Sequence, residues 1–168
     1  TIARKMGEMF KAIGLLPTDN VIEVSRNQMV GKYMGETPKL VNSLCDRAMG
    51  GILFIDEAYT LYDADGGNGD KFGKEAVEAL MKRMEDDKGK FVVIAAGYRK
   101  EMETFLKVNP GLESRFTHRL NIEDYTEMEQ VEIFKTLART KQYVLPETTE
   151  AAMIDTIHHL RMNKNRSF

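Results

Sequence analysis

Residues 51–59 read Gly51-Ile52-Leu53-Phe54-Ile55-Asp56-Glu57-Ala58-Tyr59, an apolar run that ends in two adjacent carboxylates. The continuous apolar run predicts a strand buried on both faces of a sheet. Its carboxyl end would lie at the edge where open α/β sheets bind ligands. There, Asp56 can hold Mg²⁺ through water while Glu57 orients a water against a terminal phosphate. The stretch therefore predicts a Walker B segment.

The rest of the chain alternates apolar strands with amphipathic helices. A short strand is expected at 21–24 and a central one at 91–97, with a further strand possible at 119–122. Apolar residues at helical spacing predict helices near 1–13, 38–48, 72–85 and 102–106. The alternation predicts an α/β fold with a parallel sheet. Residues 1–125 would form this α/β part, and the helical pattern over 126–168, broken near Pro146, would begin a separate small subdomain.

Composition is that of an ordinary soluble domain. The 168 residues carry 24 basic and 26 acidic side chains, a net charge of −2, and form no basic block of the kind that marks a nucleic-acid footprint. No apolar stretch has the length needed to cross a bilayer. Cys45 is the only cysteine, so an internal disulfide is excluded and a reducing, cytoplasmic setting is expected. Its place on an apolar helix face predicts a buried, unreactive thiol.

Four stretches in this order resemble AAA+ ATPases of the group that contains red-type Rubisco activase and stage V sporulation protein K. The resemblance covers nearly the whole chain, and the order and spacing of the stretches make it specific. The stretches are Val30 to Thr37, Ala48 to Tyr62, Val92 to Tyr98, and Asn109-Pro110-Gly111-Leu112-Glu113-Ser114-Arg115-Phe116. The implied fold is a P-loop NTPase core followed by the start of a helical lid.

The resemblance implies roles for individual residues. Asp56 would support Mg²⁺, Glu57 would position the attacking water, and Arg115 would be an arginine finger that reaches the nucleotide of a neighbouring subunit. Tyr33, with Met34 and Gly35, would form a pore loop that grips a threaded polypeptide. The implied cofactors are ATP and Mg²⁺. The implied assembly is a ring, expected to be a hexamer, that acts on protein clients and binds neither nucleic acid nor membrane.

Two features depart from the family pattern. Gly97-Tyr98-Arg99 stands where relatives place a polar sensor residue, so Tyr98 or Arg99 would have to contact the nucleotide instead. The sequence contains no Gly-x-x-x-x-Gly-Lys-Ser/Thr phosphate loop, and its first residues resemble the helix that follows such a loop. The chain is thus expected to be a fragment that begins after the P-loop strand and stops within the lid. By itself it should bind ATP poorly, because the phosphate cradle is absent.

Several alternatives stay open. Asp56 and Glu57 could simply end a strand at a turn, Arg115 could be a structural arginine, and Tyr33 could pack on its own domain. The chain could also be a non-hydrolysing scaffold that keeps the family's geometry for protein interaction. A clamp-loader or DNA-remodelling function is disfavoured by the balanced charge and the aromatic loop. The Gly/Asp-rich segment 63–70 invites a calcium site, which its ligand order argues against.

Overall fold

The chain divides into two units, Thr1–His118 and Arg119–Phe168. The structure, a computed structural model, describes residues 2–62, 71–146 and 148–164. The loop predicted at 63–70, with the calcium site rejected there, lies outside the described residues. The same holds for Thr1 and for residues 165–168.

A parallel sheet organises the first unit. The described residues place β1 (Val21–Val24), β2 (Ile52–Ile55) and β3 (Val92–Ala95) side by side in the order β1-β2-β3. The strands are in register, with Ile55 opposite Val24 on one side and opposite Ala95 on the other. All three therefore end at one edge of the sheet. The predicted parallel α/β fold is confirmed.

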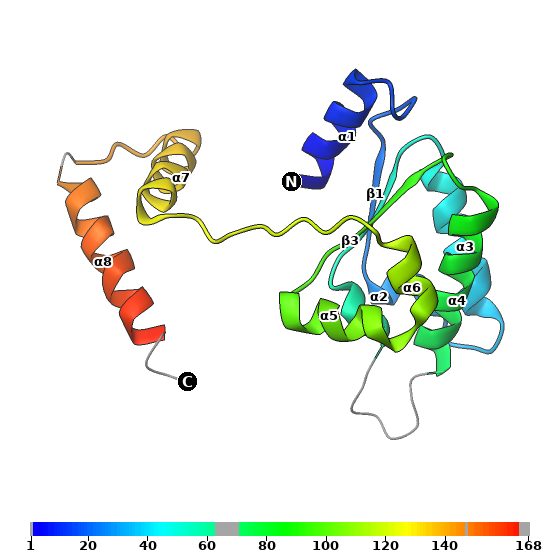
Figure 1. The fold of residues 1–168 in the computed structure, drawn as a ribbon. Coiled ribbons are helices and arrows are strands. Elements are labelled where there is room, and N and C mark those ends of the chain that lie inside the picture. The colour runs from blue at the N-terminus through cyan, green and yellow to red at the C-terminus, as the bar shows by residue number, and fades with distance from the viewer. Residues whose placement is uncertain (1, 63–70, 147, 165–168) are drawn as a thin grey trace. The chain divides into compact units, whose positions relative to one another are not determined.

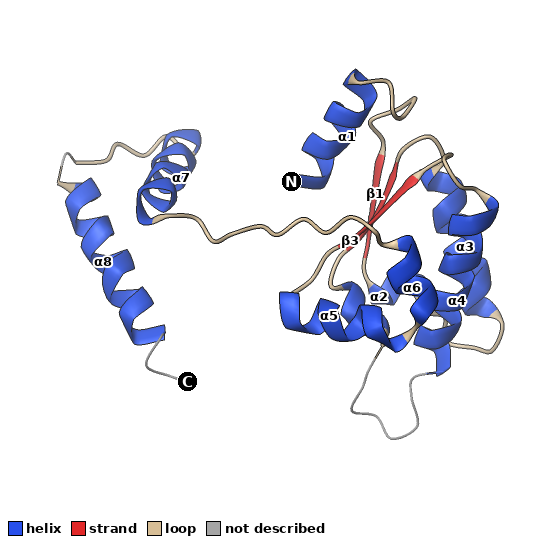
Figure 2. Cartoon of the chain, viewed as in Figure 1, coloured by secondary structure: helices blue, strands red, loops and turns tan. Residues whose placement is uncertain are grey.

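Helices cover both faces of this sheet (Figures 1 and 2). α1 (Ile2–Ala12) lies on one side, and α3 (Glu36–Ala48) and α4 (Lys71–Asp86) pack against each other on the other side. Alternate residues of β2 divide between the faces. Leu53 and Ile55 join the main core, which also contains Val24, Met29, Val41, Leu44, Cys45, Ala48, Ala76, Val77 and Leu80.

Short helices connect the strand ends. α2 (Arg26–Met29) follows β1, and the 3₁₀ helix η1 (Ala58–Leu61) follows β2. After β3 the chain forms α5 (Arg99–Val108) and then α6 (Pro110–Arg115). Asn109 separates these two helices and caps the second, because its side-chain oxygen accepts from the Gly111 amide at 2.8 Å. Pro110 then occupies the first turn, where no amide hydrogen is needed.

The second unit is a pair of helices, α7 (Glu127–Thr140) and α8 (Thr149–Lys164). Thr126 and Glu129 form a reciprocal capping box that starts α7. Lys135 of α7 pairs with Glu150 at the start of α8. None of the helices in the described part of the chain is long and apolar enough to span a membrane.

The prediction of a strand at 119–122 is wrong. Residues 119–126, all within the described part, form neither helix nor strand, and Leu120 and Ile122 are exposed. The alternation of Leu120 and Ile122 with polar residues fits a strand. A strand also requires a neighbour for its backbone groups, and this segment is paired with none of the described strands.

Candidate nucleotide site

Asp56 and Glu57 lie directly after β2, at the edge where the three strands end. The Asp56 amide donates to the Val24 carbonyl at 2.8 Å, which continues the β1–β2 ladder by one residue. Asp56 Oδ1 accepts from the Glu57 amide at 3.1 Å. Both residues are exposed, whereas Ile55 before them is buried. The strand thus fixes the backbone of two carboxylates that face solvent.

The Glu57 backbone adopts a conformation that side-chain-bearing residues seldom take. Its φ is 47° and its ψ is 47°, in the left-handed region. Thr60 stabilises this turn, because its amide and its hydroxyl donate to the Glu57 carbonyl at 2.8 and 2.7 Å. Strained backbone of this kind is concentrated at functional sites, where surrounding contacts hold it in place. Glu57 therefore forms a turn between the end of β2 and the start of η1.

Tyr59 makes the closest described contact to the Glu57 carboxylate. Its hydroxyl donates to Glu57 Oε1 at 3.1 Å. Burial raises the pKa of the Tyr59 phenol, and the bond to the Glu57 carboxylate raises that pKa further. Sequence reasoning did not select Tyr59, although it stands only two residues after Glu57. The contact accompanies a turn with a positive φ at Glu57, a conformation that gives no sequence signal in a glutamate.

Tyr98, which follows the neighbouring strand β3, packs beside the Tyr59 ring. It follows β3 and is the residue that precedes α5, with its side chain exposed. The ring centroids of Tyr98 and Tyr59 lie 6.2 Å apart, a tilted aromatic pair. The Ala58 amide also donates to the Ala96 carbonyl at 2.9 Å, which ties the two strand ends together. The structure therefore brings Asp56, Glu57 and Tyr98 to one edge.

The loop at 31–35 presents its apolar side chains to solvent. Tyr33 and Met34 are 71% and 77% exposed. The loop backbone is nevertheless held firmly, because Glu36 Oε2 accepts from the amides of Lys32 and Tyr33 at 3.1 and 3.2 Å. Gly35 closes the loop at a φ of 80°. Tyr33 thus does not pack on its own domain in this structure, which leaves it available as the predicted pore-loop residue.

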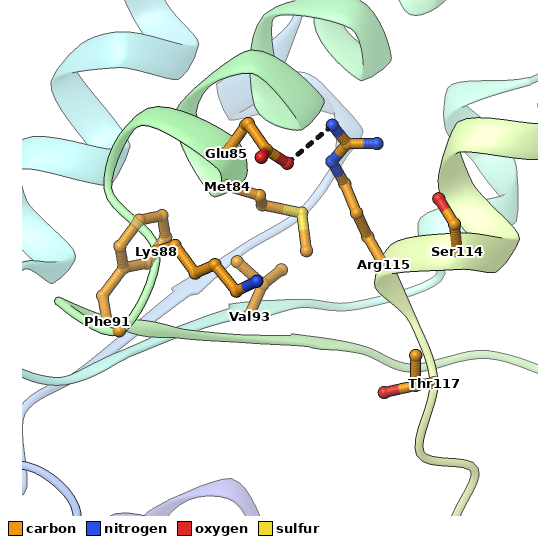
Figure 3. Close-up of a pocket in the computed structure, with 9 residues that line it drawn as sticks. Met84, Glu85, Lys88, Phe91, Val93, Ser114, Arg115 and Thr117 are labelled. Atoms are coloured by element: carbon orange, nitrogen blue, oxygen red, sulfur yellow. Dashed lines mark hydrogen bonds and ion pairs between the residues drawn. The ribbon is translucent and has the colours of Figure 1, made fainter.

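Arg115 lies in a separate pocket of about 420 Å³ (Figure 3). Its Nη2 pairs with Glu85 Oε2 at 3.0 Å, and its Nη1 donates to the Gly111 carbonyl at 3.2 Å. Its Nε is buried and has no hydrogen-bond partner among the residues that the structure describes. An unsatisfied buried donor is unfavourable, so hydrogen bonds do not fully offset the cost of burying this guanidinium.

Arg115 and the two carboxylates belong to different ends of the sheet. Phe91 and Val93, at the start of β3, line the Arg115 pocket. Asp56 and Glu57 instead follow the end of β2, in register with the end of β3. The structure therefore does not bring Arg115 to the carboxylates of its own chain.

The carboxylates at the carboxyl edge of the sheet suit a cation that keeps most of its water better than a cation bound only by protein ligands. None of the described residues forms a group of three or more metal-ligating side chains. Mg²⁺ usually keeps several waters and is bound by one or two carboxylates together with substrate phosphates. The exposed Asp56 carboxylate fits that mode. If nucleotide binds here, Asp56 would hold the ion through water and the ion would neutralise phosphate charge.

Comparison with known proteins identifies the family. The model for the "ATPase family associated with various cellular activities (AAA)" matches residues 1–124. Stage V sporulation protein K of Bacillus subtilis (strain 168) is 42% identical over 155 residues, which cover 92% of this chain and 47% of that protein. Protein CfxQ of Xanthobacter flavus is 37% identical over 165 residues, which cover 98% of this chain and 51% of that protein.

A secretion protein also matches. ESX-1 secretion system protein EccA1 of Mycolicibacterium smegmatis is 39% identical over 155 residues, 92% of this chain and 27% of that protein. The chain therefore spans about half the length of the first two relatives and a smaller share of the third. These matches confirm the resemblance inferred from the motifs. The chain belongs to the AAA family of ATPases.

Proposed function

We propose that this chain is part of an ATP-hydrolysing ring motor that remodels or threads protein clients. Family membership supports nucleotide use in general. The observation that carries the hydrolytic role is the placement of Asp56 and Glu57, exposed and side by side, at the carboxyl edge of a parallel sheet. Asp56 supports Mg²⁺ through water, and Glu57 orients the water that attacks the terminal phosphate.

Arg115 acts on the nucleotide of a neighbouring subunit. The support is its distance from the carboxylates of its own chain, since its pocket is at the other end of β3. A guanidinium suits charge that grows on phosphoryl oxygens. To reach a neighbour's phosphate, Arg115 releases Glu85 and binds the phosphate instead. Its Nε, which donates to none of the described residues, can then donate to a phosphate oxygen. Each active site is thereby completed at a subunit interface, and the expected ring is a hexamer.

Tyr33 and Met34 grip the client. Their exposure supports this role, as do the hydrogen bonds from the loop amides to Glu36. An aromatic side chain and a flexible thioether contact many sequences without requiring a particular charge. Hydrolysis moves this loop along a central pore. Tyr98, next to Tyr59 at the strand edge, contacts the nucleotide in place of the usual polar sensor.

A glutamine substitution at Glu57 in the intact protein tests the hydrolytic role. Glu57→Gln keeps the size of the side chain and removes the charge that orients water, so ATP affinity should persist while turnover falls at least about 100-fold. Glu78→Gln, at an exposed position of α4, is the matched control and should keep normal turnover. Normal turnover in Glu57→Gln would overturn the role. Absence of turnover in the unmodified protein would favour the non-hydrolysing scaffold.

Mixing two inactive variants tests whether Arg115 acts between subunits. Arg115→Ala keeps Glu57, and Glu57→Gln keeps Arg115. In mixed rings, about a quarter of the interfaces would combine an intact Glu57 with an intact Arg115 from the next subunit, by random assortment around a closed ring. ATPase activity should therefore reappear on mixing. A mixture as inactive as its components would show that Arg115 does not act in trans.

A further inference from the structure

The geometry points to Tyr59 as a positioning residue for the Glu57 carboxylate, acting through the hydrogen bond from its hydroxyl to Oε1. This inference rests on the hydrolytic role proposed above for Glu57. The hydroxyl-to-carboxylate distance is 3.1 Å. Hydrogen bonds to a charged acceptor are stronger than those between neutral groups. The bond therefore restricts the rotation of a side chain that is otherwise exposed to solvent.

The Tyr59 ring is itself held in place. It is half-buried at the second position of η1 and packs against the main core. Tyr98 lies beside it as an aromatic neighbour. The ring also lies over the backbone of Gly97, where a Cβ would come 2.6 Å from Tyr59 Cδ1. The glycine two residues after β3 thus leaves space for the ring and for the Met102 side chain.

The bond from Tyr59 also makes the two oxygens of the Glu57 carboxylate unequal. Oε1 already accepts from Tyr59, so Oε2 has the greater free capacity to accept a hydrogen bond from the attacking water. Holding a catalytic group in one orientation lowers the entropic cost of reaching the transition state. The strained turn at Glu57 and the bond from Tyr59 act on the same residue, one through the backbone and the other through the carboxylate. Tyr59 does not itself contact the reacting atoms.

Tyr59→Phe in the intact protein tests the inference, because it removes the hydroxyl and keeps the ring. We expect kcat to fall about five-fold, the effect of losing one hydrogen bond, with the half-saturating ATP concentration unchanged. Tyr62→Phe removes a hydroxyl from a half-buried tyrosine three residues away and serves as the control.

Repeating the Tyr59→Phe substitution in a Glu57→Asp protein distinguishes a positioning role of Tyr59 from a general structural one. In Glu57→Asp the shorter side chain withdraws the carboxylate from the Tyr59 hydroxyl. Tyr59→Phe should then cause no further loss of kcat. The inference is overturned if Tyr59→Phe leaves kcat unchanged in the natural background. It is also overturned if the substitution lowers kcat equally beside Glu57→Asp. Full turnover in Glu57→Gln would instead refute the proposed function, a distinct result.

Discussion

Cys45 shows how burial sets the chemistry of a single residue. Its side chain lies on α3 within the main core and is fully buried. Burial raises the pKa of the Cys45 thiol to about 11, although Arg83 partly opposes the shift. The thiolate is the reactive form, so almost none is present at neutral pH. The expectation of a buried cysteine is confirmed.

The testable consequence is slow alkylation. Because Cys45 is the only cysteine, iodoacetamide labelling followed by mass spectrometry reports on this residue alone. At about pH 8 the folded protein should label at least about 100-fold more slowly than the protein in denaturant, since both access and ionisation are suppressed. Comparable rates in the two conditions would contradict the buried position.

At the scale of structural elements, a buried threonine holds the start of the loop that follows α2. Thr37, in the first turn of α3, is fully buried, and its hydroxyl accepts from the Gly31 amide at 3.0 Å. Gly31 is buried as well, and a Cβ there would come 2.5 Å from Glu36 Cβ. The hydroxyl of Thr37 therefore satisfies a backbone donor that water reaches poorly. This contact fixes the start of the loop that displays Tyr33.

Thr37→Val should destabilise the fold while preserving the shape of the side chain. The Gly31 amide would lose its acceptor, at a cost of about 1–3 kcal/mol in the free energy of unfolding. Urea unfolding measures this change, and faster hydrogen exchange at Gly31 would locate it. Thr104→Val, at an exposed position of α5, should change the free energy by less than about 0.5 kcal/mol. Equal effects of the two substitutions would exclude this role for Thr37.

The elements that carry the site were predictable because their signals are local. The apolar runs that predicted strands in 51–59 and 91–97 contain β2 and β3. The stripes that predicted helices at 38–48 and 72–85 correspond to α3 and α4. α6 was not predicted, because Asn109-Pro110-Gly111 suggests a break in the chain. In the structure Asn109 instead caps a new helix. Contacts between distant segments give no local signal. The spacing of residues therefore indicated neither that 119–122 would pair with none of the described strands nor that Arg115 would contact Glu85.

At the scale of the whole first unit, a network of ion pairs connects the packed helices α3 and α4. Arg83 of α4 pairs with Asp46 of α3 and with Asp87, both at 2.7 Å. Asp87 in turn pairs with Lys90 at 2.9 Å. The hydrogen bond from Lys90, followed by that from Arg83, lowers the pKa of Asp87 below its usual value of 3.8. Folding therefore favours the ionised form of this carboxylate.

This network predicts how stability responds to acid. A carboxylate with a lowered pKa in the folded state contributes stability that is complete above its unfolded pKa of 3.8. The contribution is lost as the pH falls through the folded pKa. Asp87→Asn should therefore lower the urea midpoint at about pH 7 and weaken its dependence on pH below about 4. Asp86→Asn, exposed at the end of the same helix, is the control. If the midpoints of Asp87→Asn and the unmodified protein fell in parallel as the pH was lowered, Asp87 would not be responsible.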